Sequence, residues 1–144
     1  MISYSVENTG MPRIKKRLVE RWIEAVLQER GYELGEVNYR FVDDTTMLKE
    51  NKRYLGHDFY TDILTFENRP FGVSEKVIYG DIIISTDRVK ENARNLKVSY
   101  QEELHRVLIH GMLHLCGLND ITPEEEKAMH LAEDKALQLL HTIQ

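Results

Sequence analysis

Residues 77–85 constrain the fold more than any other part of the chain, because they include three consecutive isoleucines at positions 82–84. Successive side chains of a β-strand point to opposite faces of the sheet, so three adjacent isoleucines place apolar surface on both faces. Strands that are apolar on both faces are typical of the centre of a sheet that helices cover. Gly80 within the run indicates a bulge or a close approach of another backbone. We therefore expect residues 77–85 to form a central strand.

Further strands and helices intermingle along the chain. Alternating apolar and polar residues predict strands over 2–6 and 36–42, and residues 61–66 are also strand-like. Helices are expected over 12–30, 43–53, 86–96 and 122–141, and from residue 99 to the glycine at 117. Pro12, Ser99 and Thr122 are expected to begin three of them. The pattern predicts one domain over residues 1–144, of the α/β or α+β class, with one small mixed sheet and helices packed on it.

The composition excludes several classes of protein. With 42% hydrophobic and 30% charged residues, the chain has no apolar run near the roughly 20 residues that a membrane-spanning helix needs. Its first residues lack the pattern of a signal peptide, and its one cysteine, Cys116, excludes an internal disulfide. We therefore expect a cytoplasmic protein without membrane contact. The net charge of −5 argues against general binding to duplex nucleic acid but leaves room for a local basic groove.

Residues 110–120, HGMLHLCGLND, carry the strongest signal for function. At about 100° per residue, His110 and His114 lie roughly 40° apart on one face of a helix, which is the geometry of a metal chelate. Gly117 is able to take the left-handed conformation that ends a helix, so that Asp120 can offer a carboxylate to the same ion. Three ligands leave a coordination position open for water or substrate, which is typical of catalytic sites. The spacing predicts one divalent ion per chain, held by His110, His114 and Asp120.

Two histidines at this spacing are also compatible with roles other than a catalytic metal site. An isolated pair is more often part of a hydrogen-bonded core than a metal site, but the glycine and carboxylate that follow favour the metal. The same spacing matches the ligands of a class of zinc peptidases, which need a glutamate as general base where this chain has Gly111. A structural zinc site normally has four protein ligands, and a fourth is not apparent. Hydrolysis of a substrate other than a peptide is the better hypothesis.

Three segments carry motifs that occur together in one bacterial family. They are His110-Gly111-x-Leu113-His114-Leu115-x-Gly117, the stretch Asn51-x-x-Tyr54-x-Gly56-x-Asp58-x-x-Thr61-Asp62-Ile63-Leu64-Thr65-Phe66, and Gly80-Asp81-Ile82-Ile83-Ile84-Ser85. These segments are similar to the signatures of the YbeY family of endoribonucleases and rRNA maturation factors, and they come in the family's order. The resemblance covers roughly residues 48–120, about half of the chain.

The resemblance implies a sheet of about four strands flanked by helices, and a zinc-dependent endoribonuclease that is specific for single strands. It implies action on ribosomal RNA precursors at the 3′ end of the small-subunit RNA, with the small ribosomal subunit as partner and a part in ribosome quality control. Two departures stand out. The family's third ligand is usually histidine, and Asp120 in its place makes a harder, less positive site that is still competent for zinc. The family's arginine before Gly56 is replaced by Leu55.

Four further residues are candidates for the reaction. Arg53, two positions before Leu55, is expected to clamp phosphate oxygens, and His57 is expected to transfer a proton near neutral pH. Each also fits a simpler role, Arg53 as a charge at a helix end and His57 as a surface loop residue. Asp62 and Asp81 would either orient ligand imidazoles or bond to backbone. A second function class stays open, a non-catalytic ribosome-assembly factor with a structural metal, which the net acidity and the missing arginine favour.

Overall fold

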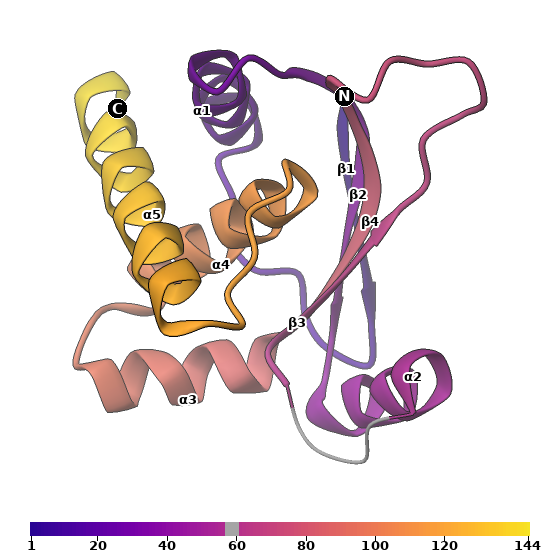
Figure 1. Ribbon diagram of the computed structural model, residues 1–144. Helices are drawn as coiled ribbons and strands as arrows, with labels where there is room; N and C mark the ends of the chain where they lie inside the picture. The colour runs from indigo at the N-terminus through magenta and orange to yellow at the C-terminus, as the bar shows by residue number, and fades with distance from the viewer. Residues whose placement is uncertain (57–60) are drawn as a thin grey trace.

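The computed structural model describes residues 1–56 and 61–144, which form four strands and five helices (Figure 1). In chain order these are β1 (Ile2–Glu7), α1 (Lys16–Glu29), β2 (Glu33–Val42), α2 (Asp44–Leu55), β3 (Ile63–Glu67), β4 (Val77–Ser85), α3 (Thr86–Leu96), α4 (Tyr100–Leu115) and α5 (Pro123–Ile143). The strands form one mixed sheet, so the predicted fold class is confirmed.

The isoleucine-rich strand β4 lies inside the sheet, whose strand order is β1-β2-β4-β3. β1 pairs with β2 and β2 with β4 in parallel, whereas β3 runs antiparallel to β4. Ile82 and Ile84 are buried in the main core, and Ile83 packs on the opposite face against Met47 and Leu64. The three isoleucines therefore bury both faces of a central strand, as expected.

Gly80 in the same strand lies where another backbone comes close. A Cβ atom at this position would stand 2.7 Å from the carbonyl oxygen of Phe66 on β3 and 2.9 Å from a methyl group of Leu115 on α4. Only glycine leaves room for both neighbours. The close approach expected at Gly80 is confirmed, and it brings the end of α4 down onto the sheet.

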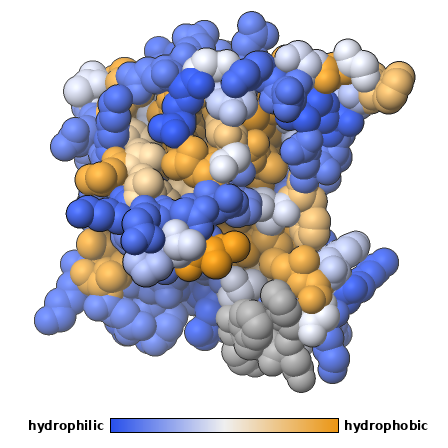
Figure 2. All heavy atoms as spheres, in the orientation of Figure 1, coloured by the Kyte–Doolittle hydropathy of each residue, from blue (hydrophilic) through white to orange (hydrophobic). Residues whose placement is uncertain are grey.

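The helices form layers on the two faces of the sheet. Figure 1 shows α1, α4 and α5 on one side and α2 on the other. Two buried polar groups tie the larger layer together and to the sheet. The Trp22 indole of α1 donates a hydrogen bond to the Ala136 carbonyl of α5 (2.7 Å), and the Tyr39 hydroxyl of β2 donates to the Leu108 carbonyl of α4 (2.7 Å). Figure 2 shows apolar side chains gathered at the centre of one face, between hydrophilic outer parts. Among the described residues, no helix is both long and apolar enough to span a membrane.

The predicted caps begin α4 and α5. The Ser99 hydroxyl accepts a hydrogen bond from the Glu102 backbone N–H (3.1 Å), and Thr122 forms a reciprocal capping box with Glu125. Gly117 follows α4 with φ of 96°, in the left-handed region that favours glycine. Both ends of the histidine-bearing helix are therefore placed by local sequence signals.

The predicted start of the first helix was wrong. α1 begins at Lys16, four residues after Pro12, which is buried outside the helix. The intervening backbone is held elsewhere, because the Arg13 carbonyl accepts a hydrogen bond from the Gln101 side chain of α4 (2.9 Å). Packing of this segment against α4 overrides the preference of proline for a first helical turn.

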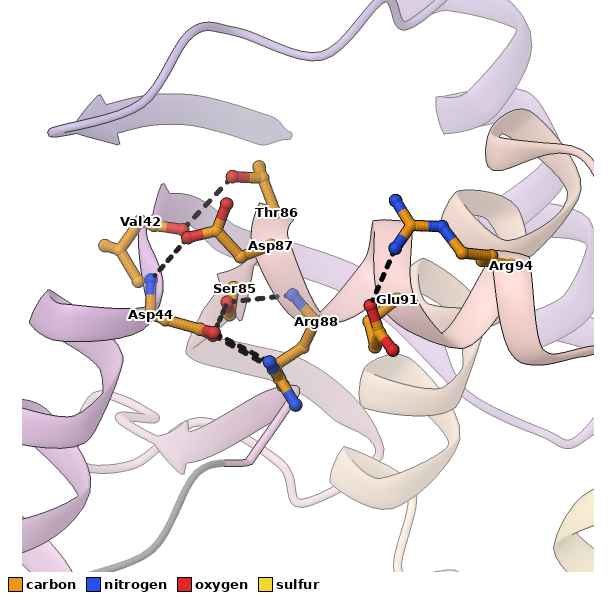
Figure 3. A network of polar contacts seen from close by, with 8 residues as sticks. All are labelled: Val42, Asp44, Ser85, Thr86, Asp87, Arg88, Glu91 and Arg94. Carbon is orange, nitrogen blue, oxygen red and sulfur yellow. Dashed lines mark hydrogen bonds and ion pairs between the residues drawn. The ribbon is translucent and has the colours of Figure 1, made fainter.

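A polar network joins the start of α2 to the junction of β4 and α3 (Figure 3). The Asp44 carboxylate accepts hydrogen bonds from the Ser85 hydroxyl (2.7 Å) and the Arg88 guanidinium (3.1 Å). The Asp44 backbone N–H donates to the Asp87 carboxylate (2.8 Å). The network holds α2, whose last turn carries Arg53, against the end of the central strand.

Candidate active site

His110 and His114 project from one face of α4, as the helical spacing predicts. Their rings are nearly parallel, with centroids 6.5 Å apart and an interplanar angle of 4°. Both line a cavity of about 360 Å³ between α4 and β3, together with Asp120 and four residues of the β3 segment: Thr61, Asp62, Ile63 and Thr65. The structure thus brings the three sequence-predicted ligands to one cavity.

Asp120 comes close to the first histidine. Its Oδ2 lies 3.4 Å from Nε2 of His110, and its side chain is 42% exposed. Two atoms that each bind a zinc ion at about 2.05 Å in tetrahedral geometry are separated by roughly 3.3 Å. His110 and Asp120 are therefore spaced like neighbouring ligands of one ion.

His114, the third predicted ligand, does not complete a metal site with His110 and Asp120 in the side-chain positions of this structure. In residues 1–56 and 61–144, no group of three or more His, Cys, Asp or Glu side chains is placed so that it could hold a metal ion. The Nδ1 atom of His114 is buried and has no hydrogen-bond partner among the described residues. Buried polar atoms normally have a partner in protein, water or an ion. The donor set suits zinc, and the zinc site itself stays a prediction.

Glu133 on α5 holds the other nitrogen of His110. Its Oε2 lies 2.6 Å from Nδ1 of His110, and its Oε1 accepts a hydrogen bond from Arg106 (2.9 Å). Burial by itself would raise the pKa of Glu133, but the hydrogen bonds with His110 and Arg106 outweigh it and lower the pKa. Burial would lower the pKa of His110, and the same contact with Glu133 outweighs that effect and raises it. A proton on Nδ1 of the neutral ring leaves the lone pair of Nε2 free, so Nε2 is the atom that could bind a metal ion beside Asp120.

Glu133 was not among the candidate residues of the sequence analysis, although a signal for it existed. The buried residues of α5 are Met129, Glu133, Ala136, Leu137 and Leu140, so one carboxylate lies on an otherwise apolar face. Glutamate is almost never fully buried unless it is paired. A glutamate at such a position indicates a partner on the element that packs against it.

The two aspartates considered as orienting residues have different surroundings. Asp62 lines the cavity, but its carboxylate accepts a hydrogen bond from the Asn92 side chain (3.3 Å), and burial raises its pKa against the opposing effect of His110. Asp81 accepts from the Asn68 side chain (2.7 Å) and lines a different cavity with Asn38. The hypothesis that Asp81 orients a ligand imidazole is wrong, because side chains alternate along β4 and residue 81 faces away from α4.

Of the two residues proposed for phosphate and proton handling, Arg53 lies away from the cavity. It is exposed in the last turn of α2, with its guanidinium 5.1 Å from the ring centroid of Tyr54, and it does not line the cavity with His110. Its role at a phosphate stays a prediction. His57 lies outside the described residues.

The peptidase hypothesis loses its geometric basis at Gly111. A Cβ atom there would lie 2.9 Å from Ile82 and 3.1 Å from Ile63, on the side of α4 that faces the sheet. A glutamate at this position, where such peptidases carry their general base, would have to displace both isoleucines and would point at the sheet.

Comparison with known proteins connects this cavity to one family. The family model described as Endoribonuclease YbeY matches residues 3–141. The chain belongs to the YbeY family. It is 45% identical over 139 residues to Endoribonuclease YbeY of Porphyromonas gingivalis strain W83, covering 96% of this chain and 89% of that protein. It is 46% identical over 140 residues to Endoribonuclease YbeY of Phocaeicola vulgatus, covering 97% and 99%.

A solved structure has the same fold as this YbeY-family chain. The solution structure of TM1509 from Thermotoga maritima aligns with a TM-score of 0.66 and 28% sequence identity, covering 97% of this chain and 89% of that one. The resemblance first seen in residues 48–120 therefore extends to nearly the whole length of the chain. Family membership and the mixed sheet agree with the fold expected from the motifs.

Proposed function

We propose that this protein is a metal-dependent endoribonuclease that cleaves single-stranded parts of ribosomal RNA precursors, at the 3′ end of the small-subunit RNA. The family supports the endonuclease activity, since relatives at 45–46% identity are named Endoribonuclease YbeY. The observation that carries the proposal is the cavity in which His110 and Asp120 stand 3.4 Å apart, with His114 one turn further along α4. This substrate would place the protein in the cytoplasm, beside the small ribosomal subunit.

His110, His114 and Asp120 would hold one zinc ion. A bound ion would supply a Lewis acid that polarises a phosphoryl oxygen and promotes deprotonation of water. Glu133 keeps the proton on Nδ1 of His110, so that the ring presents its unprotonated Nε2 to the cavity. Arg106 neutralises the buried Glu133 carboxylate, which would otherwise repel an incoming phosphate.

The decisive experiment measures metal content and RNA cleavage on the same preparations. Wild type, His114→Ala and the control His141→Ala, an exposed histidine near the end of α5, are purified without a metal-affinity tag. We expect about one zinc per chain and cleavage of single-stranded RNA in wild type and His141→Ala, and loss of both in His114→Ala. Full zinc content in His114→Ala would show that the site is wrongly placed.

One specific observation favours the alternative that the protein is a non-catalytic ribosome-assembly factor with a structural metal. The family's arginine is replaced by Leu55, and the nearest guanidinium in sequence, that of Arg53, packs on the ring of Tyr54. Under this alternative, His114→Ala loses metal and stability while cleavage by wild type stays at background. Absence of cleavage by zinc-loaded wild type would therefore favour the alternative.

Arg53 is the candidate that separates the two functions most directly. If its guanidinium contacts a phosphate, Arg53→Ala lowers cleavage without changing zinc content, and reduces the salt slope of single-strand binding by roughly 0.7. Lys135→Ala, which removes an exposed cation of α5, is the control. Unchanged cleavage and salt slope in Arg53→Ala would leave it as a charge placed favourably at the end of a helix.

A further inference from the structure

A second cavity adjoins the candidate active site. It has a volume of about 360 Å³ and shares Asp62, Ile63, His110 and Asp120 with the first. Its other walls come from the end of α3, from α4 and from the first half of α5, which lie near one another in Figure 1. Cavities of roughly 300–1,000 Å³ with apolar walls and a few polar groups are typical of small-ligand sites.

The cavity has apolar walls and one unpaired acceptor. Ile63, Leu96, Val107 and Met129 supply apolar surface. Glu103 of α4 also lines the cavity; it is only 5% exposed, and its Oε1 has no hydrogen-bond partner among the described residues. A buried carboxylate oxygen without a donor is costly for a folded protein. It indicates a ligand that brings the donor.

The nearest cation along α4 does not pair with Glu103. Arg106, one turn further on, donates its hydrogen bonds to Glu133 (2.9 Å) and Asp134 (2.8 Å) instead. Asp62, Glu126 and Asp120 add further carboxylates to the cavity walls. This concentration of negative charge repels a phosphate group. The group that enters must therefore be uncharged or cationic, with N–H donors for Glu103 and apolar surface for the walls.

Among the parts of an RNA strand, a nucleobase has these properties. Proteins recognise single-stranded RNA bases by contacts to their Watson–Crick edges and by packing of apolar side chains on the ring. Guanine presents two adjacent N–H donors on that edge, N1–H and N2–H, which match the two oxygens of a carboxylate. Adenine and cytosine present a donor beside an acceptor, and uracil has one donor between two acceptors. The donor pattern favours guanine.

We propose that this cavity binds the guanine base of a nucleotide next to the scissile phosphate, and that Glu103 accepts hydrogen bonds from N1–H and N2–H of that base. The proposal rests on the proposed endoribonuclease function, because the two cavities share His110 and Asp120. A base in the second cavity positions the adjoining phosphate at the first. Glu103 is then a residue that determines which linkage is cut.

The test compares equilibrium binding with cleavage. Labelled single-stranded hexaribonucleotides carry guanosine, inosine or adenosine at one position, moved stepwise along the strand. Binding is measured at pH 8, above the pKa of about 7 of Glu103, so that its carboxylate is ionised, by fluorescence anisotropy on samples shown to be uncut. Inosine lacks the N2 amino group, so it isolates one of the two hydrogen bonds. At one position, we expect wild type to bind the guanosine strand roughly fivefold or more tightly than the adenosine strand, as one bidentate contact provides, with the affinity for the inosine strand between the two. Cleavage is then mapped on the same strands.

Glu103→Gln is the informative variant, and Glu102→Gln, exposed on the same helix, is its matched control. A glutamine amide offers one acceptor and one donor, so it cannot accept from both N1–H and N2–H of guanine, but it matches N6–H and N1 of adenine. The preference for guanosine over inosine should therefore disappear, and the adenosine strand should bind more tightly than it does to wild type. Glu102→Gln should behave as wild type. Equal affinity of wild type for all three strands would overturn the proposal even if cleavage is normal.

Two further outcomes separate this proposal from others. A guanosine preference in binding without any cleavage would support the base pocket while contradicting the proposed nuclease function. Displacement of RNA by a lysine-rich peptide, with no preference among bases, would assign the carboxylates to a protein partner and overturn the proposal. Thermal melting of each variant checks that it is folded.

Discussion

Glu103→Gln should stabilise the protein at neutral pH and leave its stability unchanged in acid. Burial and the negative charge of Asp62 raise the pKa of Glu103 from 4.5 to about 7, although Arg106 opposes them. Glu133 and Glu102 also raise it. The folded protein therefore holds a proton on Glu103 over a range in which the unfolded chain has lost it.

The size and sign of the effect follow from this difference. Between pH 4.5 and about 7 the folded state binds more protons than the unfolded state, so the free energy of unfolding decreases as pH rises. One pKa unit corresponds to about 1.4 kcal/mol, so the full decrease from Glu103 is roughly 3 kcal/mol. Glutamine carries no charge at any pH and does not show this decrease. At pH 8, Glu103→Gln should be more stable than wild type by about that amount, and near pH 4 the two should be nearly equal.

Urea unfolding measures the difference, with a chelator present so that metal binding does not contribute. Wild type, Glu103→Gln and Glu102→Gln are compared at intervals from pH 4 to pH 8 by circular dichroism. Glu102 is exposed, so its replacement should leave the pH profile of wild type unchanged. A stability difference between Glu103→Gln and wild type that does not vary with pH would refute the reasoning.

Substitutions at Glu133, Asp120 and Gly111 also have expected outcomes. Glu133→Gln should weaken zinc binding roughly 10- to 100-fold in chelator competition, and Asp134→Asn should not; equal affinities would remove Glu133 as an orienting residue. Asp120→Ala should weaken zinc binding severely whereas Asp120→His keeps or tightens it, and wild-type affinity in Asp120→Ala would exclude this ligand. Gly111→Ala should lower stability by about 1–2 kcal/mol in urea, because a Cβ atom 2.9 Å from Ile82 overpacks the core by more than the gain in helix propensity. A more stable Gly111→Ala would show that the side chain of Ile82 moves aside freely.

The features of the fold and the site that the sequence predicted correctly are mostly those that local backbone geometry determines. The helical period places His110 and His114 on one face, and the capping residues Ser99 and Thr122 begin their helices where expected. Gly117 turns the chain after α4 so that Asp120 reaches His110. These features depend on residues within a few positions of one another, and backbone sterics and hydrogen-bond periodicity determine them.

Contacts between elements were decided by the tertiary structure alone. Glu133 reaches His110 because α5 packs against α4, and a sequence separation of 23 residues across a turn carries no information about that register. The burial of Glu103 likewise depends on α3, α5 and β3 closing over α4, since the side chain of an isolated helix would be solvated. Asp81 faces away from the histidines because strand pairing settles which face of the sheet meets the helical layer. Sequence periodicity predicts which residues share one face of a helix or strand. Only the packing of the elements decides which residues of other elements that face contacts.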